Sequence, residues 1–184
     1  MDFVRPARAV ELSLLGGLGH YETVLEAVRR AELSVWIATA NLKELLIKET
    51  RGSWRSVLEV LDELLSRGVE LRILHAALPS RPFRERFDSL PRLVNGGLEL
   101  RLCPRVHFKT VIVDAELLYL GSANWTGAGL GAKGTHRRNF ELGIWTRDEG
   151  VIDEVQAYFD TIWRGSCCRD CRVKEGCESP LDER

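Results

Sequence analysis

The chain has 184 residues, 45% of them hydrophobic, and a formal net charge of -1. This composition suits one globular domain with a real core and excludes a globally basic nucleic-acid binder, although local basic clusters can still serve. The N-terminus lacks the uninterrupted apolar run of a signal peptide, and no segment approaches the roughly 18 apolar residues that span a bilayer. We therefore expect a soluble, cytoplasmic protein.

The first half of the chain alternates predicted helices and strands. A short apolar run over residues 10–15 precedes a helical pattern over residues 21–31, and residues 33–40 are typical of a strand. Apolar residues at helical spacing predict a helix over residues 54–65, which Arg67 and Gly68 end. A strand over residues 69–76 and a helix over residues 83–94 follow.

The second half is richer in strands. Three closely spaced strands are predicted over residues 98–103, 106–113 and 116–120, and a glycine-rich loop over residues 127–134 leads to a strand over 139–146. An amphipathic helix over residues 151–163 comes last. Because some connections are too short for crossovers, part of the sheet must be antiparallel. The predicted fold is α/β, a mixed β-sheet flanked by helices, over residues 1–164.

A histidine and a lysine stand two residues apart near the start of one predicted strand. His107 and Lys109 therefore share a face, and a nucleophile beside a fixed cation suits a phosphate. Ser122 and Asn124 come directly after the next strand, where a hydroxyl and an amide can reach the same phosphate oxygens. Glu141 can accept a proton from the second ring nitrogen of a histidine and hold its tautomer.

These residues read H-x-K-x4-D-x6-G-S-x-N from His107 to Asn124, without a gap. The pattern resembles the signature of the phospholipase D superfamily, and the likeness extends to Glu141 and to a late helix ending at Trp163. It implies a phosphodiesterase in which His107 attacks phosphorus and forms a phosphohistidine without a metal. The resemblance also gives roles to the other residues: phosphate binding for Lys109, Asn124 and Ser122, orientation of His107 for Glu141, and a mainly structural role for Asp114.

Chemistry of this kind needs a second histidine, because expelling an alkoxide at neutral pH without a proton donor is slow. His20, His75 and His136 do not open a second H-x-K pattern. The resemblance to single-motif members therefore implies a homodimer that brings two copies of His107 together in one shared site.

Local basic clusters guide the choice of substrate. The loop between two site-bearing strands carries four residues suited to binding a phosphate chain: Lys133, His136, Arg137 and Arg138. For a second cluster, Arg81, Arg84, Arg86 and Arg92, a binding role and a solvated surface are both open. No exposed docking element for lipid is evident, so a nuclease is the favoured function. The alternatives are a phospholipase or cardiolipin hydrolase, and a non-catalytic nucleic-acid-binding module, against which the intact motif argues.

One glycine pattern is a false lead. Residues 129–134 fit G-x-G-x-x-G, but a dinucleotide fingerprint follows a strand and opens a helix. Here the pattern leads into a predicted strand, so we interpret it as a loop beside the site.

The tail over residues 165–184 is rich in cysteine. It holds Cys167, Cys168, Cys171 and Cys177, whereas Cys103 stands alone in the domain, a layout poor for a disulfide framework. Four close thiols predict a structural zinc site, with an iron–sulfur cluster as the alternative and a tail that binds no metal as the third interpretation. Adjacent Cys167 and Cys168 cannot easily ligate one ion, and Cys103 could supply a ligand instead.

Overall fold

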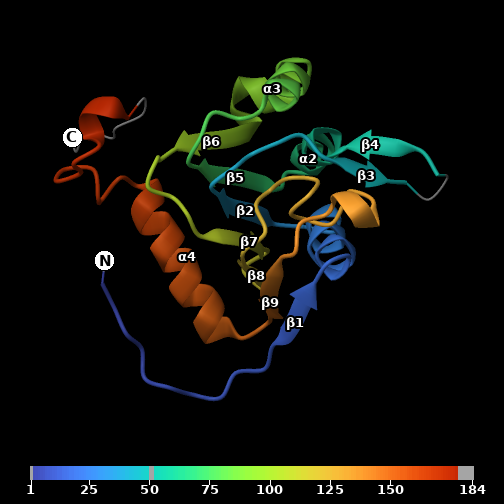
Figure 1. Cartoon of the computed structure of the whole chain (residues 1–184). Helices are drawn as coiled ribbons and strands as arrows, with labels where there is room; N and C mark the ends of the chain where they lie inside the picture. Colours follow the sequence, from blue (N-terminus) through green and yellow to red (C-terminus); the bar gives the residue numbers. More distant parts are fainter. Residues whose placement is uncertain (1, 50–51, 178–184) are drawn as a thin grey trace.

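The computed structural model describes residues 2–49 and 52–177. Within them, the centre of the molecule is a seven-stranded sheet in the order β1-β9-β8-β7-β2-β5-β6 (Figure 1). Its strands are β1 (Ser13–Gly16), β2 (Ser34–Thr39), β5 (Glu70–His75), β6 (Leu98–Leu102), β7 (Lys109–Val113), β8 (Leu117–Gly121) and β9 (Leu142–Thr146). The β2-β5 and β5-β6 pairs are parallel and the others are antiparallel, which confirms the predicted mixed sheet.

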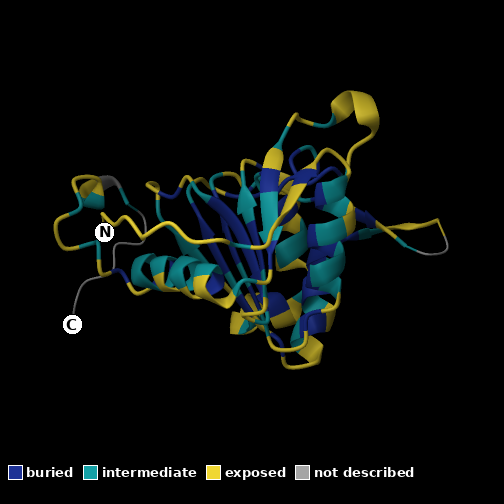
Figure 2. Cartoon of the chain, turned by 90° about the horizontal axis from the view of Figure 1, so that it is seen from below, coloured by how far each residue is buried: buried dark blue, intermediate teal, exposed yellow. Residues whose placement is uncertain are grey.

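Helices cover both faces of the sheet (Figure 2). One face carries the π-helical turn η1 (Tyr21–Leu25), α1 (Glu26–Arg29) and α2 (Val57–Ser66), and the other carries α4 (Glu149–Trp163). Smaller elements are the hairpin β3 (Leu46–Lys48) and β4 (Trp54–Ser56), α3 (Arg81–Asp88), η2 (Leu93–Gly97), η3 (Thr135–Arg137) and η4 (Lys174–Gly176). No helix in the described part of the chain is long and apolar enough to cross a membrane.

Alternation along the central strands divides the core in two. Val35 and Ile37 of β2 belong to the larger apolar cluster with α2, whereas Trp36 and Ala38 face the α4 side. There the ring of Trp36 lies 5.3 Å from that of Phe159 in α4. The N-terminal segment runs beside α4, where Arg5 forms an ion pair with Glu154 (2.7 Å). Strands buried on both faces explain the near-continuous apolar runs in the sequence.

Several predicted boundaries were wrong. The helix predicted over residues 54–65 begins at Val57, because Ser56 caps it by accepting a hydrogen bond from the Leu58 amide (3.1 Å), and residues 54–56 pair with β3. The helix predicted over 83–94 is interrupted between α3 and η2, near Pro91. The strands predicted over 106–113 and 139–146 begin at Lys109 and Leu142.

The topology gathers many chain connections at one edge of the sheet. Ala38, near the end of β2, pairs with Thr110 near the start of β7, and Lys109 pairs with Gly121 at the end of β8. Gly121 in turn lies opposite Gly143 near the start of β9. Segments that follow β1, β2 and β8 therefore meet those that precede β7 and β9. This edge contains the predicted site.

Candidate active site

His107 lies just before β7, and Lys109 is its first residue. The imidazole is exposed, whereas Lys109 is only 7% exposed and directs its ammonium back along the chain. Lys109 Nζ donates to the His107 carbonyl oxygen and lies 3.3 Å from His107 Nδ1. Burial lowers the pKa of Lys109, while the charge of Glu141 acts in the opposite direction. The pair therefore presents an accessible imidazole directly beside a fixed nitrogen donor.

Glu141 and Ser122 meet across the connection between β8 and β9. Ser122 Oγ donates to Glu141 Oε2 and accepts from the Leu142 amide (3.1 Å). The other carboxylate oxygen accepts from Asn139 Nδ2 (3.0 Å). Within the described residues no hydrogen bond joins Glu141 to His107, the contact that an orienting role needs. The single chain thus holds the carboxylate close to the site and the imidazole turned toward Lys109.

Asn124 is held by the end of β2. Its side-chain oxygen accepts hydrogen bonds from the amides of Ala40 and Asn41, each at 3.1 Å, and from Thr39 Oγ1 at 3.2 Å. Backbone amides only donate, so these contacts fix which end of the side chain is the oxygen. The Nδ2 amide nitrogen must then point away from these backbone amides. Asn124 can give a phosphate two N–H donors and no acceptor.

Tyr119 supports the turn that carries Ser122. Its hydroxyl accepts from the Ala123 amide (3.1 Å), and burial raises its pKa to about 12. The ring fits only because two facing residues lack side chains: a Cβ on Gly143 would lie 2.2 Å from Tyr119 Cε2, and one on Gly121 would lie 2.5 Å from the hydroxyl. The glycine of the G-S-x-N pattern is thus required by close packing.

Asp114 lies at the opposite end of β7. Its carboxylate accepts from the amides of Leu33 (2.7 Å), Ser34 (2.8 Å) and Glu32 (3.0 Å), where the chain enters β2. Asp114 (φ 55°) and Ala115 (φ 54°) both have left-handed backbone conformations, as a tight hairpin between β7 and β8 requires. These contacts fit the structural role that the resemblance implies, and they place the carboxylate far from His107.

His20 is a buried histidine that sequence reasoning did not select for the site. It is fully buried and lies edge-on to Tyr119 (5.4 Å between ring centroids). Burial lowers its pKa, and the charge of Glu141 acts against this shift. Nδ1 lies 3.3 Å from the Gly17 carbonyl oxygen, and Nε2 has no partner in the described part of the chain. Because tertiary packing alone brings His20 under the site, no local pattern could reveal it.

The two basic clusters differ in their partners. In the second cluster, Arg81 pairs with Glu85 (2.7 Å), while Arg86 and Arg92 pair with carboxylates of α2. By contrast, no ion pair within residues 2–49 and 52–177 involves the cationic members of the loop cluster, Lys133, Arg137 and Arg138. Lys133, His136 and Arg137 are exposed. Within the described residues, the cations of the loop cluster therefore lack the carboxylate partners that Arg81, Arg86 and Arg92 have.

The tail cysteines and Cys103 line one cavity of about 350 Å³. Among the described residues, no group of three or more histidine, cysteine or acidic side chains is arranged to hold a metal ion. The metal site in the tail therefore stays a prediction. Residues 178–184 of the predicted tail module lie outside the described residues.

Comparison with known proteins places the chain in a family. Residues 24–163 match the family described as cardiolipin synthase, PLD-like domain. The chain therefore belongs to the phospholipase D superfamily, as its motif predicted, and phosphodiester chemistry is the activity of that superfamily.

Curated relatives and solved structures agree with this assignment. The chain is 27% identical to cardiolipin synthase 1 of Staphylococcus epidermidis, over 82% of this chain and 32% of the relative. It is 31% identical to cardiolipin synthase A of Pseudomonas fluorescens, over 79% of this chain and 29% of the relative. It thus spans about a third of these relatives.

Two stand-alone structures share the fold over nearly their whole length. NucT from Helicobacter pylori (TM-score 0.61, 17% identity) is matched over 84% of this chain and 96% of its own. Nuc from Salmonella typhimurium, a phospholipase D family member (TM-score 0.60, 19% identity), is matched over 83% and 95%. At such identities the likeness shows the fold alone.

Proposed function

We propose that this protein is a nuclease that cleaves nucleic-acid phosphodiester bonds through a phosphohistidine at His107, in a site completed by a second copy of the chain. The loop cluster beside Glu141, whose cations form no ion pair among the described residues, is the observation that carries the choice of nucleic acid. Exposed cations without carboxylate partners attract a continuous phosphate chain at little desolvation cost. A single lipid phosphate would engage only part of this cluster.

The proposed reaction has two balanced steps. His107 attacks phosphorus, a P–N bond forms, the P–O bond breaks, and the leaving oxygen takes a proton from the partner subunit's His107. That second imidazole then takes a proton from water, whose oxygen attacks phosphorus and releases His107. Lys109 and Asn124 stabilise the charge on the non-bridging oxygens with N–H donors, and Ser122 holds Glu141 by a hydrogen bond.

An uncovered apolar surface beside the site supports the homodimer. Leu14 in β1 pairs with Ile144 in β9, and Leu142 lies two residues before Ile144 on the same strand. All three side chains therefore lie on the same face of the sheet, which α4 covers further along the strands. Leu14 is 70% exposed, Leu142 64% exposed, and neighbouring Phe140 fully exposed. Exposed apolar groups of this size mark interaction surfaces. A second copy is the proposed occupant, because one chain supplies a single H-x-K histidine.

The first test compares substrates without divalent metal. Purified protein is incubated in EDTA with labelled DNA, RNA and cardiolipin-containing vesicles, alongside His107→Ala. We expect nucleic-acid cleavage that survives chelation and disappears in the variant. Activity that is lost in EDTA and returns with magnesium, in protein that stays folded, would contradict the phosphohistidine mechanism.

Subunit mixing tests the shared site. Wild-type and His107→Ala chains exchange freely, and activity is measured against the wild-type fraction x. Hybrids lack either the nucleophile or the acid, and such a loss typically costs orders of magnitude in rate, so activity should follow x squared. A linear dependence on x would refute the shared site and leave His107 as the nucleophile of a monomer.

Phospholipid chemistry is the second candidate, favoured by the 27% and 31% identity to two cardiolipin synthases. It predicts that vesicles rather than nucleic acid are consumed in the substrate comparison. It also predicts that Phe140 and Leu142 contact membrane and not a partner chain, so Phe140→Ser would reduce vesicle binding and leave subunit assembly unchanged.

A further inference from the structure

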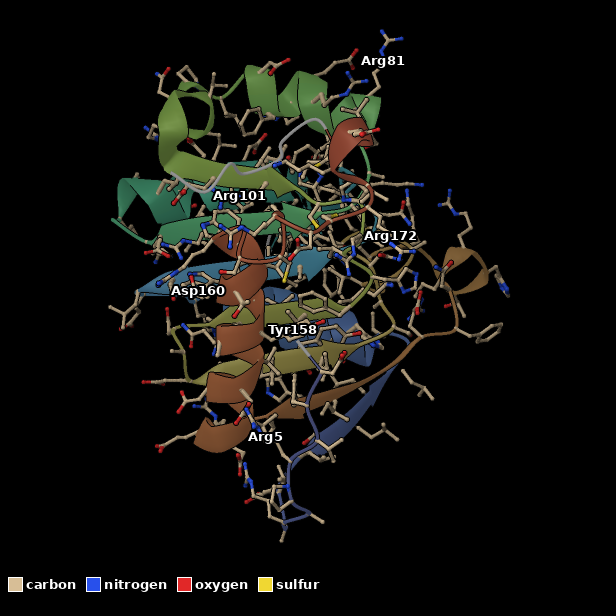
Figure 3. The ribbon with its side chains drawn as sticks, turned by 90° about the vertical axis from the view of Figure 1, so that its left-hand side faces the viewer. Arg5, Arg81, Arg101, Tyr158, Asp160 and Arg172 are labelled. Atoms are coloured by element: carbon tan, nitrogen blue, oxygen red, sulfur yellow. The ribbon has the colours of Figure 1, made fainter. Side chains whose placement is uncertain are left out.

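Cysteines far apart in the sequence meet at one place in the fold. A cavity of about 350 Å³ lies near the C-terminal end of α4. Its lining includes Cys103, from the connection between β6 and β7, and the tail residues Cys167, Cys168, Cys171 and Cys177. Figure 1 shows this connection passing close to the end of α4, and Figure 3 shows the tail on the α4 side of the sheet. Solitary Cys103 thus joins the cysteine-rich tail.

The backbone of the tail turns at its cysteines. The Cys171 amide donates to the Cys168 carbonyl oxygen (3.2 Å), closing a turn with a thiol at each end. In the next two turns, the Lys174 amide donates to the Cys171 carbonyl oxygen (3.1 Å) and the Cys177 amide donates to the Lys174 carbonyl oxygen (3.2 Å). Cys103 stands at its own turn, which the Val106 amide closes onto its carbonyl oxygen (2.9 Å). Two cysteines separated by two residues are a common pair of thiolate ligands.

Local geometry selects four of the five thiols. Adjacent Cys167 and Cys168 cannot easily ligate one ion together, and of the two it is Cys168 that a turn joins to Cys171. Cys103 and Cys177 line the same cavity. A cation also lies among them, since Arg105 Nη1 donates to Cys171 Sγ (3.8 Å). An arginine beside several thiolates offsets part of their negative charge.

We propose that Cys103, Cys168, Cys171 and Cys177 form a four-thiolate metal site, taking zinc or an iron–sulfur cluster, that fastens the tail to the connection leading to His107. This set differs from the four tail cysteines that the sequence suggests, because Cys103 replaces Cys167. The replacement removes the difficulty of two adjacent ligands. Since no described group already has the arrangement of metal ligands, binding requires the tail turns to close around the metal.

Such a site would act on the catalytic loop through a short segment. Only Pro104, Arg105 and Val106 separate Cys103 from His107. Val106 is buried against Phe159 and Trp163 of α4, so the segment is already anchored on one side. A metal at Cys103 would fix the other side and restrict where His107 can lie. This consequence rests on the proposed function, whereas the metal site itself does not.

The test measures metal directly. Protein purified under anaerobic, reducing conditions is analysed for zinc and iron per chain, and its visible absorption distinguishes an iron–sulfur cluster from zinc. Metal-free protein is titrated with Co²⁺, whose tetrahedral thiolate complexes absorb strongly in the visible range. We expect stoichiometric metal in the wild type and in Cys167→Ser, and its loss in Cys103→Ser and Cys168→Ser.

Two results would overturn the proposal: wild-type protein that neither contains metal nor gives the Co²⁺ spectrum, or metal binding that survives Cys103→Ser and is lost in Cys167→Ser. Circular dichroism shows whether each variant folds. Because a lower thermal stability alone would not show that a metal ligand is missing, the Co²⁺ titration of folded Cys103→Ser decides whether Cys103 is a ligand. His107→Ala should keep its full metal content, so failure of the catalytic proposal and failure of the metal site give different results.

Discussion

The motif aspartate offers a sharp test, because its contacts support a role in stability and not in chemistry. Asp114 follows β7, whose first residue is Lys109, so about 17 Å of strand separates it from the lysine at roughly 3.3 Å per residue. Its carboxylate is engaged by three amides at the entry to β2. We predict that changing Asp114 lowers the free energy of unfolding and leaves turnover per folded molecule unchanged.

The magnitude follows from these contacts. The half-buried hydrogen bond from Ser34 to a charged acceptor contributes about 2 kcal/mol, and the more exposed ones from Glu32 and Leu33 about 0.5 kcal/mol each. Alanine at a left-handed φ adds about 1 kcal/mol. Asp114→Ala should therefore cost about 4 kcal/mol and lower Tm by about 8–16 °C. Asp114→Asn keeps an acceptor and tolerates this backbone, so it should cost about 1 kcal/mol.

Calorimetry and nuclease assays on the same preparations separate the two roles. His107→Ala serves as the reverse control, with Tm unchanged and activity lost. Asp114→Asn protein that melts like the wild type but has lost activity would refute this reasoning, and it would require a path from Asp114 to the site that the fold does not provide.

Other predictions test the packing, the buried histidines and the basic loop. Gly143→Ala should cost about 1–3 kcal/mol by displacing Tyr119, whereas Gly134→Ala, with no atom within 4 Å of the new Cβ, should be nearly neutral in denaturant titration. Burial lowers the pKa of His20 and of His75, so the unfolded chain takes up protons first on acidification. Stability is therefore complete above the ordinary histidine pKa and should fall below it, by at most about 1.4 kcal/mol per pH unit for each histidine. A denaturation midpoint that rises on acidification contradicts this. Replacing the three loop cations, Lys133, Arg137 and Arg138, by glutamine should reduce the slope of the logarithm of the DNA-binding constant against the logarithm of the salt concentration by up to about 3. The same replacement at the ion-paired arginines, Arg81, Arg86 and Arg92, should leave this slope nearly unchanged.

The sequence predicted the sheet and the family well, because both are recorded in local patterns. Short apolar runs mark β2 and β5, and the spacing from His107 to Asn124 carries the family signature. Boundaries were less certain where two signals overlapped. Trp54 continues the helical spacing of α2, yet Ser56 with Glu59 three residues later is the better signal, since that pair is typical of a helix start.

Contacts made by tertiary packing were beyond any local pattern. Nothing around His20 indicates that it lies against Tyr119, and nothing around Asn124 shows that its oxygen is held by Ala40 and Asn41. The pairing state of a basic cluster is equally hidden, because the carboxylate opposite Arg92 is Asp62, 30 residues earlier. Sequence could therefore favour the loop cluster for binding, but only the fold shows which arginines of the second cluster are ion-paired.

The placement of these features follows from strand direction. β7 and β9 begin at the edge where β1, β2 and β8 end. The residues that precede β7 and β9 therefore converge there with the residues that follow β1, β2 and β8. β5 and β6 run parallel to β2, which brings the connection bearing Cys103 to the same edge. The opposite edge receives the hairpin of Asp114 and its amide donors. The proposed catalytic residues and the Asp114 hairpin thus lie at opposite edges of one sheet, and we expect substitutions at the two edges to have separable effects.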